Sequence, residues 1–85
     1  MAETKLTLGD LRKKYNEIHQ ASICISDVAQ LANVSMGDVY TTEAGGFVSK
    51  HIVEKVVRAF SILSHQDVRI QDITVHITDL TKSTR

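Results

Sequence analysis

The stretch that most constrains this chain runs over residues 25–44, ISDVAQLANVSMGDVYTTEA, and its pattern predicts two short helices joined by a tight turn. Asn33 stands at the point where the backbone must turn sharply between them. Apolar or small side chains recur where such a pair would bury them, at Val28, Ala29, Ala32, Val34 and Val39. The small side chain of Ala29 would let the two helices cross closely.

Each of these helices has a start signal in the sequence. Ser26 can open the first helix, because its hydroxyl accepts a hydrogen bond from a free backbone N–H in the following turn. Ser35 and Asp38 form an S-x-x-D signal for the second, a capping box with a shorter acid than Glu or Gln. We therefore expect a helix-turn-helix over about residues 26–44.

A first helix is expected over residues 7–20, before this pair. Thr7 and Asp10 repeat the start signal. Spacings of three and four residues place one apolar stripe on a single helix face, made by Leu8, Leu11, Tyr15 and Ile18. The helix should therefore lie on the surface with this stripe turned inward.

A longer helix is expected after the pair. Gly45 and Gly46 end the preceding helix, since glycine accepts a left-handed backbone, and Ser49 can cap a helix that runs to about residue 64. Its inward stripe is Ile52, Val56, Ala59, Phe60 and Leu63. Val53 and Val57 widen this stripe. We expect them either to meet a second subunit or to pack under the C-terminal segment.

The C-terminal segment has a strand pattern, because Ile73, Val75 and Ile77 alternate with polar residues. A helical face of Ile70, Ile73, Ile77 and Leu80 also fits, and we favour the strand. A lone strand leaves backbone groups unpaired, so it would pair with its copy in a symmetric dimer. Residues 81–85 are expected to be a frayed tail.

Composition indicates one small domain. The 85 residues are 42% hydrophobic and 24% charged, as in ordinary globular domains, and ten basic residues balance ten acidic ones. Neutrality lowers the expectation of nucleic-acid binding without excluding it, since a local patch can contact phosphates. The N-terminus lacks a secretion signal and no apolar run could span a bilayer, so we expect a cytoplasmic protein. Cys24 is expected to be a buried apolar residue.

The sequence favours neither an enzyme nor a metal protein. His19, His51, His65 and His76 have no spacing that would place two of them on one helix face beside a further ligand. Nothing in the sequence marks a base for a Cys24 nucleophile, and the two adjacent glycines lack the phosphate-loop pattern. We therefore expect no catalytic residues, no metal and no cofactor.

The order of these elements resembles the lambda-repressor-like, or Xre/Cro-type, helix-turn-helix regulators. DVAQLANVS is similar to the helix-turn element of that family, and Glu43-Ala44-Gly45 to its E-x-G sequence after the recognition helix. The resemblance covers about residues 8–63. The same run also resembles the start of LacI-type headpieces, but those lack the helix that is expected here over residues 7–20. Ile25 stands where the family commonly has a phosphate-contacting Gln.

The resemblance implies that the helix starting at Ser35 enters the DNA major groove. The residues that would face the DNA are Ser35, Met36, Gly37, Tyr40 and Thr41. None of these is the bidentate Arg, Gln or Asn of most specific readers. Phosphate contacts would come from basic residues elsewhere, namely Arg12, Lys13, Lys14, Lys50, His51 and Lys55.

We therefore expect a mainly α, small helical bundle with a helix-turn-helix, acting as a sequence-specific DNA-binding regulator and homodimer. The predicted dimerisation residues are Val53, Val57, Ile73, Val75 and Ile77. The alternative is a helix-turn-helix-fold module that binds a regulatory protein rather than DNA. The predicted core is Leu8, Leu11, Tyr15, Ile18, Val28, Ala29, Leu31, Val39, Ile52, Val56 and Phe60.

Overall fold

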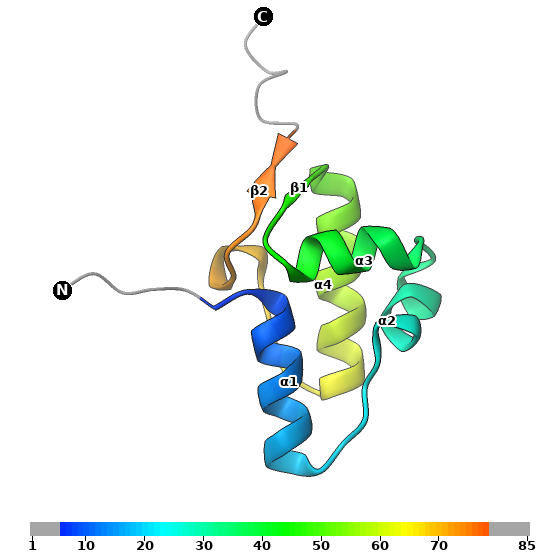
Figure 1. The fold of residues 1–85 in the computed structure, drawn as a ribbon, viewed down its shortest axis with the longest axis vertical. Helices are drawn as coiled ribbons and strands as arrows, with labels where there is room; N and C mark the ends of the chain where they lie inside the picture. Colours follow the sequence, from blue (N-terminus) through cyan, green and yellow to red (C-terminus); the bar gives the residue numbers. More distant parts are fainter. Residues whose placement is uncertain (1–5, 79–85) are drawn as a thin grey trace, which may run out of the picture.

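The computed structural model describes residues 6–78, which form a small, mainly helical bundle with one short sheet (Figure 1). The elements in chain order are α1 (Leu8–His19), α2 (Ile25–Ala32), α3 (Met36–Glu43), β1 (Phe47–Val48), α4 (Lys50–Ser64), the 3-10 turn η1 (Ile70–Asp72) and β2 (His76–Ile77). The predicted mainly α class is confirmed. None of the described helices is both long and apolar enough to span a membrane.

The core forms around α4, which contacts α1, α2, α3 and η1 (Figure 1). Its apolar face repeats every three to four residues, as the sequence predicts, and Phe60 on this face is fully buried. The other helices each add a few apolar side chains to the same cluster, among them Leu8, Val28, Ala29 and Val39. A single cluster of buried residues therefore holds the helices together.

The predicted start signals are confirmed for three helices. Thr7 and Asp10 form a reciprocal capping box on α1: Asp10 N donates to Thr7 Oγ1 at 3.1 Å, and Thr7 N donates to Asp10 Oδ2 at 3.4 Å. The hydroxyl of Ser35 accepts from Asp38 N at 3.0 Å on α3, and that of Ser49 caps α4.

The expected start of α2 at Ser26 is wrong by two residues. Cys24 is the N-cap, and its backbone N–H donates to Asp27 Oδ2 at 2.9 Å. The Asp27 carboxylate therefore accepts a hydrogen bond at the start of α2, where the sequence predicts the Ser26 hydroxyl as the acceptor. Cys24 lies on the surface rather than in the core, and its thiol donates to the carbonyl of Ser22 at 3.4 Å.

Asn33 makes the turn between α2 and α3, as predicted. Its backbone is left-handed, with φ 61° and ψ 48°, a conformation that asparagine adopts more readily than most residues. Val34 N then donates to Ala29 O at 3.1 Å, which closes the end of α2. Ala29 is buried on the face of α2 that meets its neighbours, so the close pair of short helices exists over residues 25–43.

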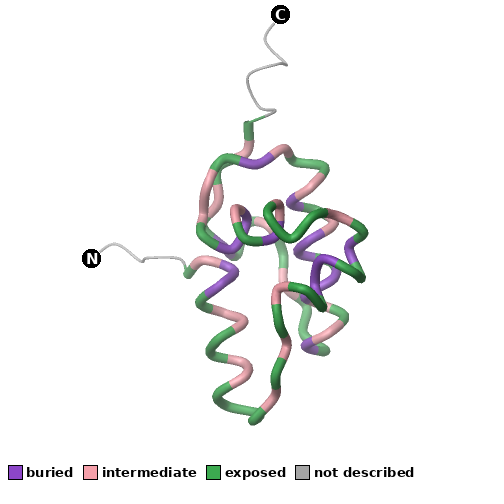
Figure 2. The backbone as a smooth tube through the Cα atoms, turned by 45° about the vertical axis from the view of Figure 1, so that its right-hand side comes forward, coloured by how far each residue is buried: buried purple, intermediate pink, exposed green. Residues whose placement is uncertain are grey.

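Two predicted core residues are exposed. Ile18 is 64% exposed because α1 buries only Leu8 and Gly9, at its first turn, and the end of the helix runs past the core (Figure 2). Leu31 is 47% exposed, since an eight-residue helix covers only a narrow strip, made here by Val28, Ala29 and Ala32. Leu11, Tyr15 and Ile52 are partly buried against the core.

The C-terminal strand exists, but its partner lies in the same chain. β2 pairs in parallel with β1, with Phe47 opposite His76 and Val48 opposite Ile77. The expected pairing with a second copy is therefore wrong, because Phe47 and Val48 were not recognised as a strand. Leu80 and residues 81–85 lie outside the described residues.

The residues predicted to make the dimer are used inside one chain. Val53, Val57 and Ile73 are buried, while Val75 and Ile77 are partly buried against the core. Val68 and Ile70 of the C-terminal segment pack against the core cluster to which Val57 belongs, in agreement with the alternative that it packs under this segment. We therefore withdraw these five residues as a subunit interface.

Two glycines give a paired test of the backbone at the ends of α3. Gly45 has φ +80°, and a Cβ there would lie 3.2 Å from Thr74 O, whereas a Cβ on Gly37 would meet only Ser35 Oγ at 3.8 Å. We expect Gly45→Ala to lower the free energy of unfolding by about 1 kcal/mol or more, and Gly37→Ala to raise it by about 0.5 kcal/mol. Urea denaturation measures both, and equal effects would contradict this account.

Candidate nucleic-acid interface

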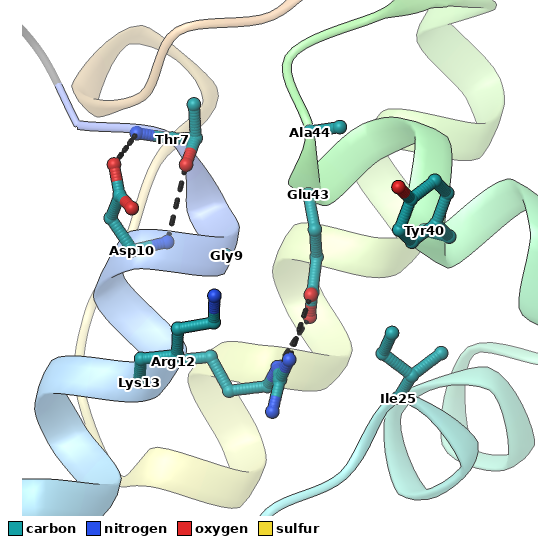
Figure 3. Close-up of a pocket in the computed structure, with 9 residues that line it drawn as sticks. All are labelled: Thr7, Gly9, Asp10, Arg12, Lys13, Ile25, Tyr40, Glu43 and Ala44. Carbon is teal, nitrogen blue, oxygen red and sulfur yellow. Dashed lines mark hydrogen bonds and ion pairs between the residues drawn. The ribbon is translucent and has the colours of Figure 1, made fainter.

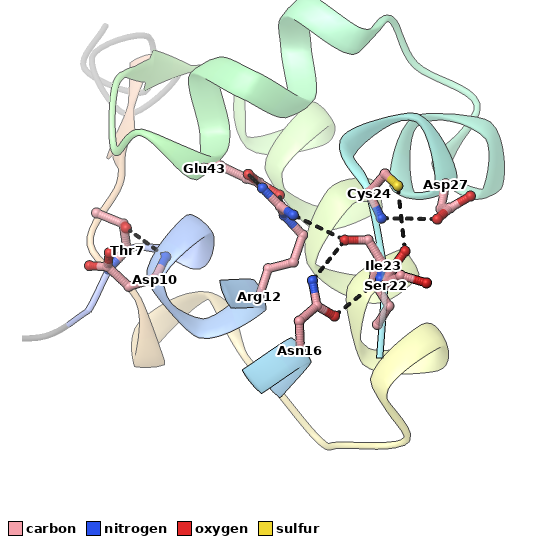
Figure 4. A network of polar contacts seen from close by, with 9 residues as sticks. All are labelled: Thr7, Asp10, Arg12, Asn16, Ser22, Ile23, Cys24, Asp27 and Glu43. Atoms are coloured by element: carbon pink, nitrogen blue, oxygen red, sulfur yellow. Dashed lines mark hydrogen bonds and ion pairs between the residues drawn. The ribbon is translucent and has the colours of Figure 1, made fainter. Parts of the chain in front are cut away.

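A partly buried ion pair joins the first helix to the end of the third (Figure 4). Arg12 Nε lies 2.7 Å from Glu43 Oε2, and Arg12 Nη2 lies 3.1 Å from Glu43 Oε1, so the guanidinium holds the carboxylate with two parallel bonds. The two side chains are only 14% and 6% exposed. Arg12 is therefore not the free cation that we expected on the surface, and we withdraw it as a phosphate contact.

The same arginine also holds the segment that leads into α2. Arg12 Nη1 donates to the carbonyl of Ile23 at 3.0 Å. Asn16, one turn further along α1, brackets the same residue: its amide nitrogen donates to Ile23 O at 3.0 Å, and its amide oxygen accepts from Ile23 N at 3.1 Å. α1 therefore positions both the start of α2 and the end of α3 (Figure 4).

The absence of a side chain at Gly9 lets α1 and α3 approach closely. A Cβ at this position would lie 3.1 Å from the carbonyl oxygen of Glu43 and 3.3 Å from its Cβ, which is tighter than ordinary van der Waals contact. Gly9 lies one turn before Arg12 on α1. The close packing at Gly9 and the ion pair between Arg12 and Glu43 therefore hold the same end of α3.

This arrangement leaves one side of α3 outside the bundle. Val39, Thr42 and Glu43 are buried on the inner side. On the outer side, Tyr40 is 63% exposed and Met36 is 55% exposed. The exposed positions continue at Ser35 and Gly37, which were also predicted to face a partner.

Thr41 differs from the other predicted contact residues on α3. Its hydroxyl donates to the carbonyl of Gly37 at 2.9 Å, and its methyl group lies 2.9 Å from where a Cβ on Gly46 would be. It is only partly exposed. Thr41 therefore supports the local backbone, and Tyr40 is the better probe of the outer face.

Tyr40 borders a hollow of about 270 Å³ between α1, α2 and α3 (Figure 3). Lys13 of α1 and Ile25, the first residue of α2, line the same hollow. A second hollow, lined by Ser26, Gln30 and Met36 among others, adjoins the outer side of α3 at its first residue. The two hollows therefore place the start of α2, the outer side of α3 and one lysine of α1 on one surface.

The other predicted basic contacts are spread more widely. Lys14 is exposed on α1, and Lys50 and His51 are exposed at the start of α4, while Lys55 is half-buried. None of these four lines the hollow beside Tyr40. Among the predicted cations, Lys13 and the paired Arg12 line the hollow that Tyr40 borders, and the other four do not.

Three acidic residues near this surface are bound to backbone N–H groups or paired, while Asp38 adds a further carboxylate in the first turn of α3. The carboxylates of Asp10 and Asp27 accept N–H groups at the starts of α1 and α2, where the positive end of the helix dipole offsets their charge. Glu43 is neutralised by Arg12. Sequence reasoning missed this pair, because its partners are 31 residues apart and no local spacing relates them.

Comparison of the chain with protein-family models, curated proteins and solved structures finds no match. Within residues 6–78, no three His, Cys, Asp or Glu side chains gather where they could hold a metal ion. The site must therefore be interpreted from its own residues.

A double-mutant cycle tests whether Arg12 and Glu43 act as a pair. We expect Arg12→Met or Glu43→Leu alone to lower the free energy of unfolding by about 3 kcal/mol, because each leaves a partly buried charge without its partner. The double variant should lose clearly less than the sum of the two. Urea denaturation of the four proteins measures this coupling, and strictly additive losses would show that the pair does not act as a unit.

Proposed function

We propose that this protein is a sequence-specific, DNA-binding regulator that places α3 in the major groove. The observation that carries the proposal is the exposed outer side of α3, where Tyr40 shares a hollow with Lys13 and with Ile25 at the start of α2. An α-helix fits the width of the major groove, so a helix held by its inner side and open on its outer side can enter it. The resemblance to lambda-repressor-like regulators supports the same docking.

The chemistry of the outer side allows contacts with both bases and phosphates. The hydroxyls of Ser35 and Tyr40 can donate to phosphate oxygens or base acceptors, and Met36 can contact the methyl group of thymine. Gly37 lets the DNA approach the backbone at the first turn. None of these residues is an Arg, Asn or Gln that could make a bidentate contact with a base, so we infer that DNA shape and apolar contact contribute much of the specificity.

The neutral net charge of the chain is compatible with this proposal because a few exposed lysines can contact phosphates without an overall excess of cations. Lys13 and Lys14 lie exposed on α1, whereas the N-terminus of α2 already offsets the Asp27 carboxylate and α3 has Asp38 in its first turn. With few cations, binding should depend on salt less steeply than for strongly basic repressors.

Tyr40→Ala tests the interface directly. Duplexes selected by the wild-type protein from a random pool serve as the probe, and fluorescence anisotropy measures affinity at several salt concentrations. We expect Tyr40→Ala to weaken binding about 5-fold, the loss of a hydrogen bond worth about 1 kcal/mol. Thermal stability should stay near that of the wild type, because the side chain is mostly exposed. Recovery of no enriched duplex would contradict the proposal.

Lysine substitutions separate phosphate contacts from base contacts. Lys13→Gln with Lys14→Gln should weaken binding to all duplexes alike and reduce the salt dependence by about one unit of slope for each phosphate that the variant no longer neutralises. Arg69→Gln is the matched control, since Arg69 is an exposed cation that lines a different hollow and pairs with Asp67. Equal effects of both changes would place the DNA elsewhere on the molecule.

A protein partner is the second candidate function. The observation that favours it is that Ser35, Met36, Gly37 and Tyr40, the exposed residues of the outer side, are all uncharged. Aromatic residues and methionine are enriched at protein interfaces, where a neutral surface costs little to desolvate. Retention on heparin or random duplex DNA at low salt, lost as salt rises, distinguishes the two: no retention would favour the protein partner.

A further inference from the structure

A second exposed surface lies where α2 and α4 pack together, and it adjoins the outer side of α3 through Gln30, which lines a hollow on each. We define the α2–α4 surface by its apolar centre, Leu31, Ile62 and Leu63, and by Asp27, Lys55 and Arg58 around it; the buried Ala59 lines one of its hollows. Leu31 and Ile62 are 47% and 55% exposed, and Leu63 is partly exposed beside them. Large exposed aliphatic side chains that gather across two helices mark a surface for contact with another molecule.

We propose that this surface is where two copies of the chain meet in a two-fold symmetric dimer. Only the role of this dimer rests on the proposed function: two copies would bind the two halves of a palindromic DNA site. The residues that form it differ from those first predicted for dimerisation, all of which lie within one chain. The choice of a second copy as the partner follows from how charge is arranged on the surface.

Charge changes sign from one end of the α2–α4 surface to the other. At one end Asp27 lines a shallow hollow with Gln30, Leu31 and Leu63. At the other end Lys55 and Arg58 line a hollow with Leu31, Ala32, Ala59 and Ile62. Leu31 borders both hollows, so it separates an acidic end from a basic end.

This polarity follows from the opposite directions of the two helices. In the acidic hollow, Asp27 near the start of α2 lies with Leu63 near the end of α4. In the basic hollow, Ala32 at the end of α2 lies with Lys55, which is nearer the start of α4. A two-fold axis near Leu31 would turn one copy end for end on the other. The acidic end of each copy then faces the basic end of its partner, and the aliphatic centres meet between them.

The α2–α4 surface leaves the proposed DNA contacts open. None of its residues lines the hollow beside Tyr40. A standard interface buries about 800 Å² on each partner, a modest share of the 5622 Å² that this chain exposes. The aliphatic centre has two large exposed side chains, Leu31 and Ile62, so monomers and dimers should exchange and the association should depend on protein concentration.

Removing the aliphatic centre is the first test. We expect the wild-type chain to form dimers as its concentration rises in sedimentation velocity experiments, and Leu31→Ser with Ile62→Ser to raise the dimer dissociation constant at least about 10-fold. Both side chains are largely exposed, so circular dichroism should show an unchanged fold. A wild-type chain that stays monomeric at millimolar concentration, or a double variant that dimerises as well as wild type, would overturn the proposal.

A charge exchange tests the predicted pairing of ends. Asp27→Arg alone and Arg58→Glu alone should each weaken the dimer, because each homodimer then brings like charges together at both ends. An equal mixture of the two variants should form heterodimers, in which position 27 of each copy again faces a position 58 of opposite sign. Failure of the mixture to recover association would overturn this arrangement.

Controls separate the interface from helix capping and from DNA binding. Asp10 accepts an N–H at the start of α1 as Asp27 does on α2, so Asp10→Arg removes an equivalent cap away from the α2–α4 surface and should leave the dimer unchanged. Tyr40→Ala should also leave it unchanged. Sedimentation is measured without DNA, so it reports loss of the dimer separately from loss of DNA binding.

Discussion

The ion pair between Arg12 and Glu43 is the contact on which the arrangement of this small bundle depends. One guanidinium holds the carboxylate at the end of α3 and the carbonyl of Ile23 before α2, so three segments meet at a single side chain. A buried pair of this kind adds little net stability, because desolvation of both charges offsets their attraction. Its directed hydrogen bonds instead specify one geometry among the packings that the apolar core alone would allow.

That geometry explains why α3 can expose a complete side. α3 has only eight residues, too few to be stable without tertiary contacts, and its outer side is uncovered. Its last turn is held through Glu43 and by close packing on Gly9, its first turn is capped by Ser35, and Val39 anchors its middle. A partner that meets Met36 and Tyr40 therefore finds a helix already fixed in place, and little ordering cost is left for binding.

The sequence predicted most features whose cause is local, and the start of α2, where Asp27 accepts from Cys24 N, is the exception. Caps at Thr7, Ser35 and Ser49 and the turn at Asn33 each depend on residues within a few positions, and helical spacing identified the apolar face of α4. Features that depend on distant partners were missed. β1 is only two residues long and is a strand solely because His76 and Ile77 lie beside it. Spacing also cannot tell which apolar positions of a short surface helix are covered, and Leu31 was assigned to the core for that reason.

α2 contributes residues to both proposed surfaces, so this one helix fixes the position of each surface relative to the other. Ser26 and Gln30 border the hollow next to Met36, whereas Asp27 and Leu31 belong to the surface shared with α4. Val28, Ala29 and Ala32 hold the helix in the core between them. A second copy bound at Leu31 would therefore set the spacing and direction of two α3 helices without a flexible linker, and small changes of packing under α2 would alter the DNA half-site spacing that the dimer can reach.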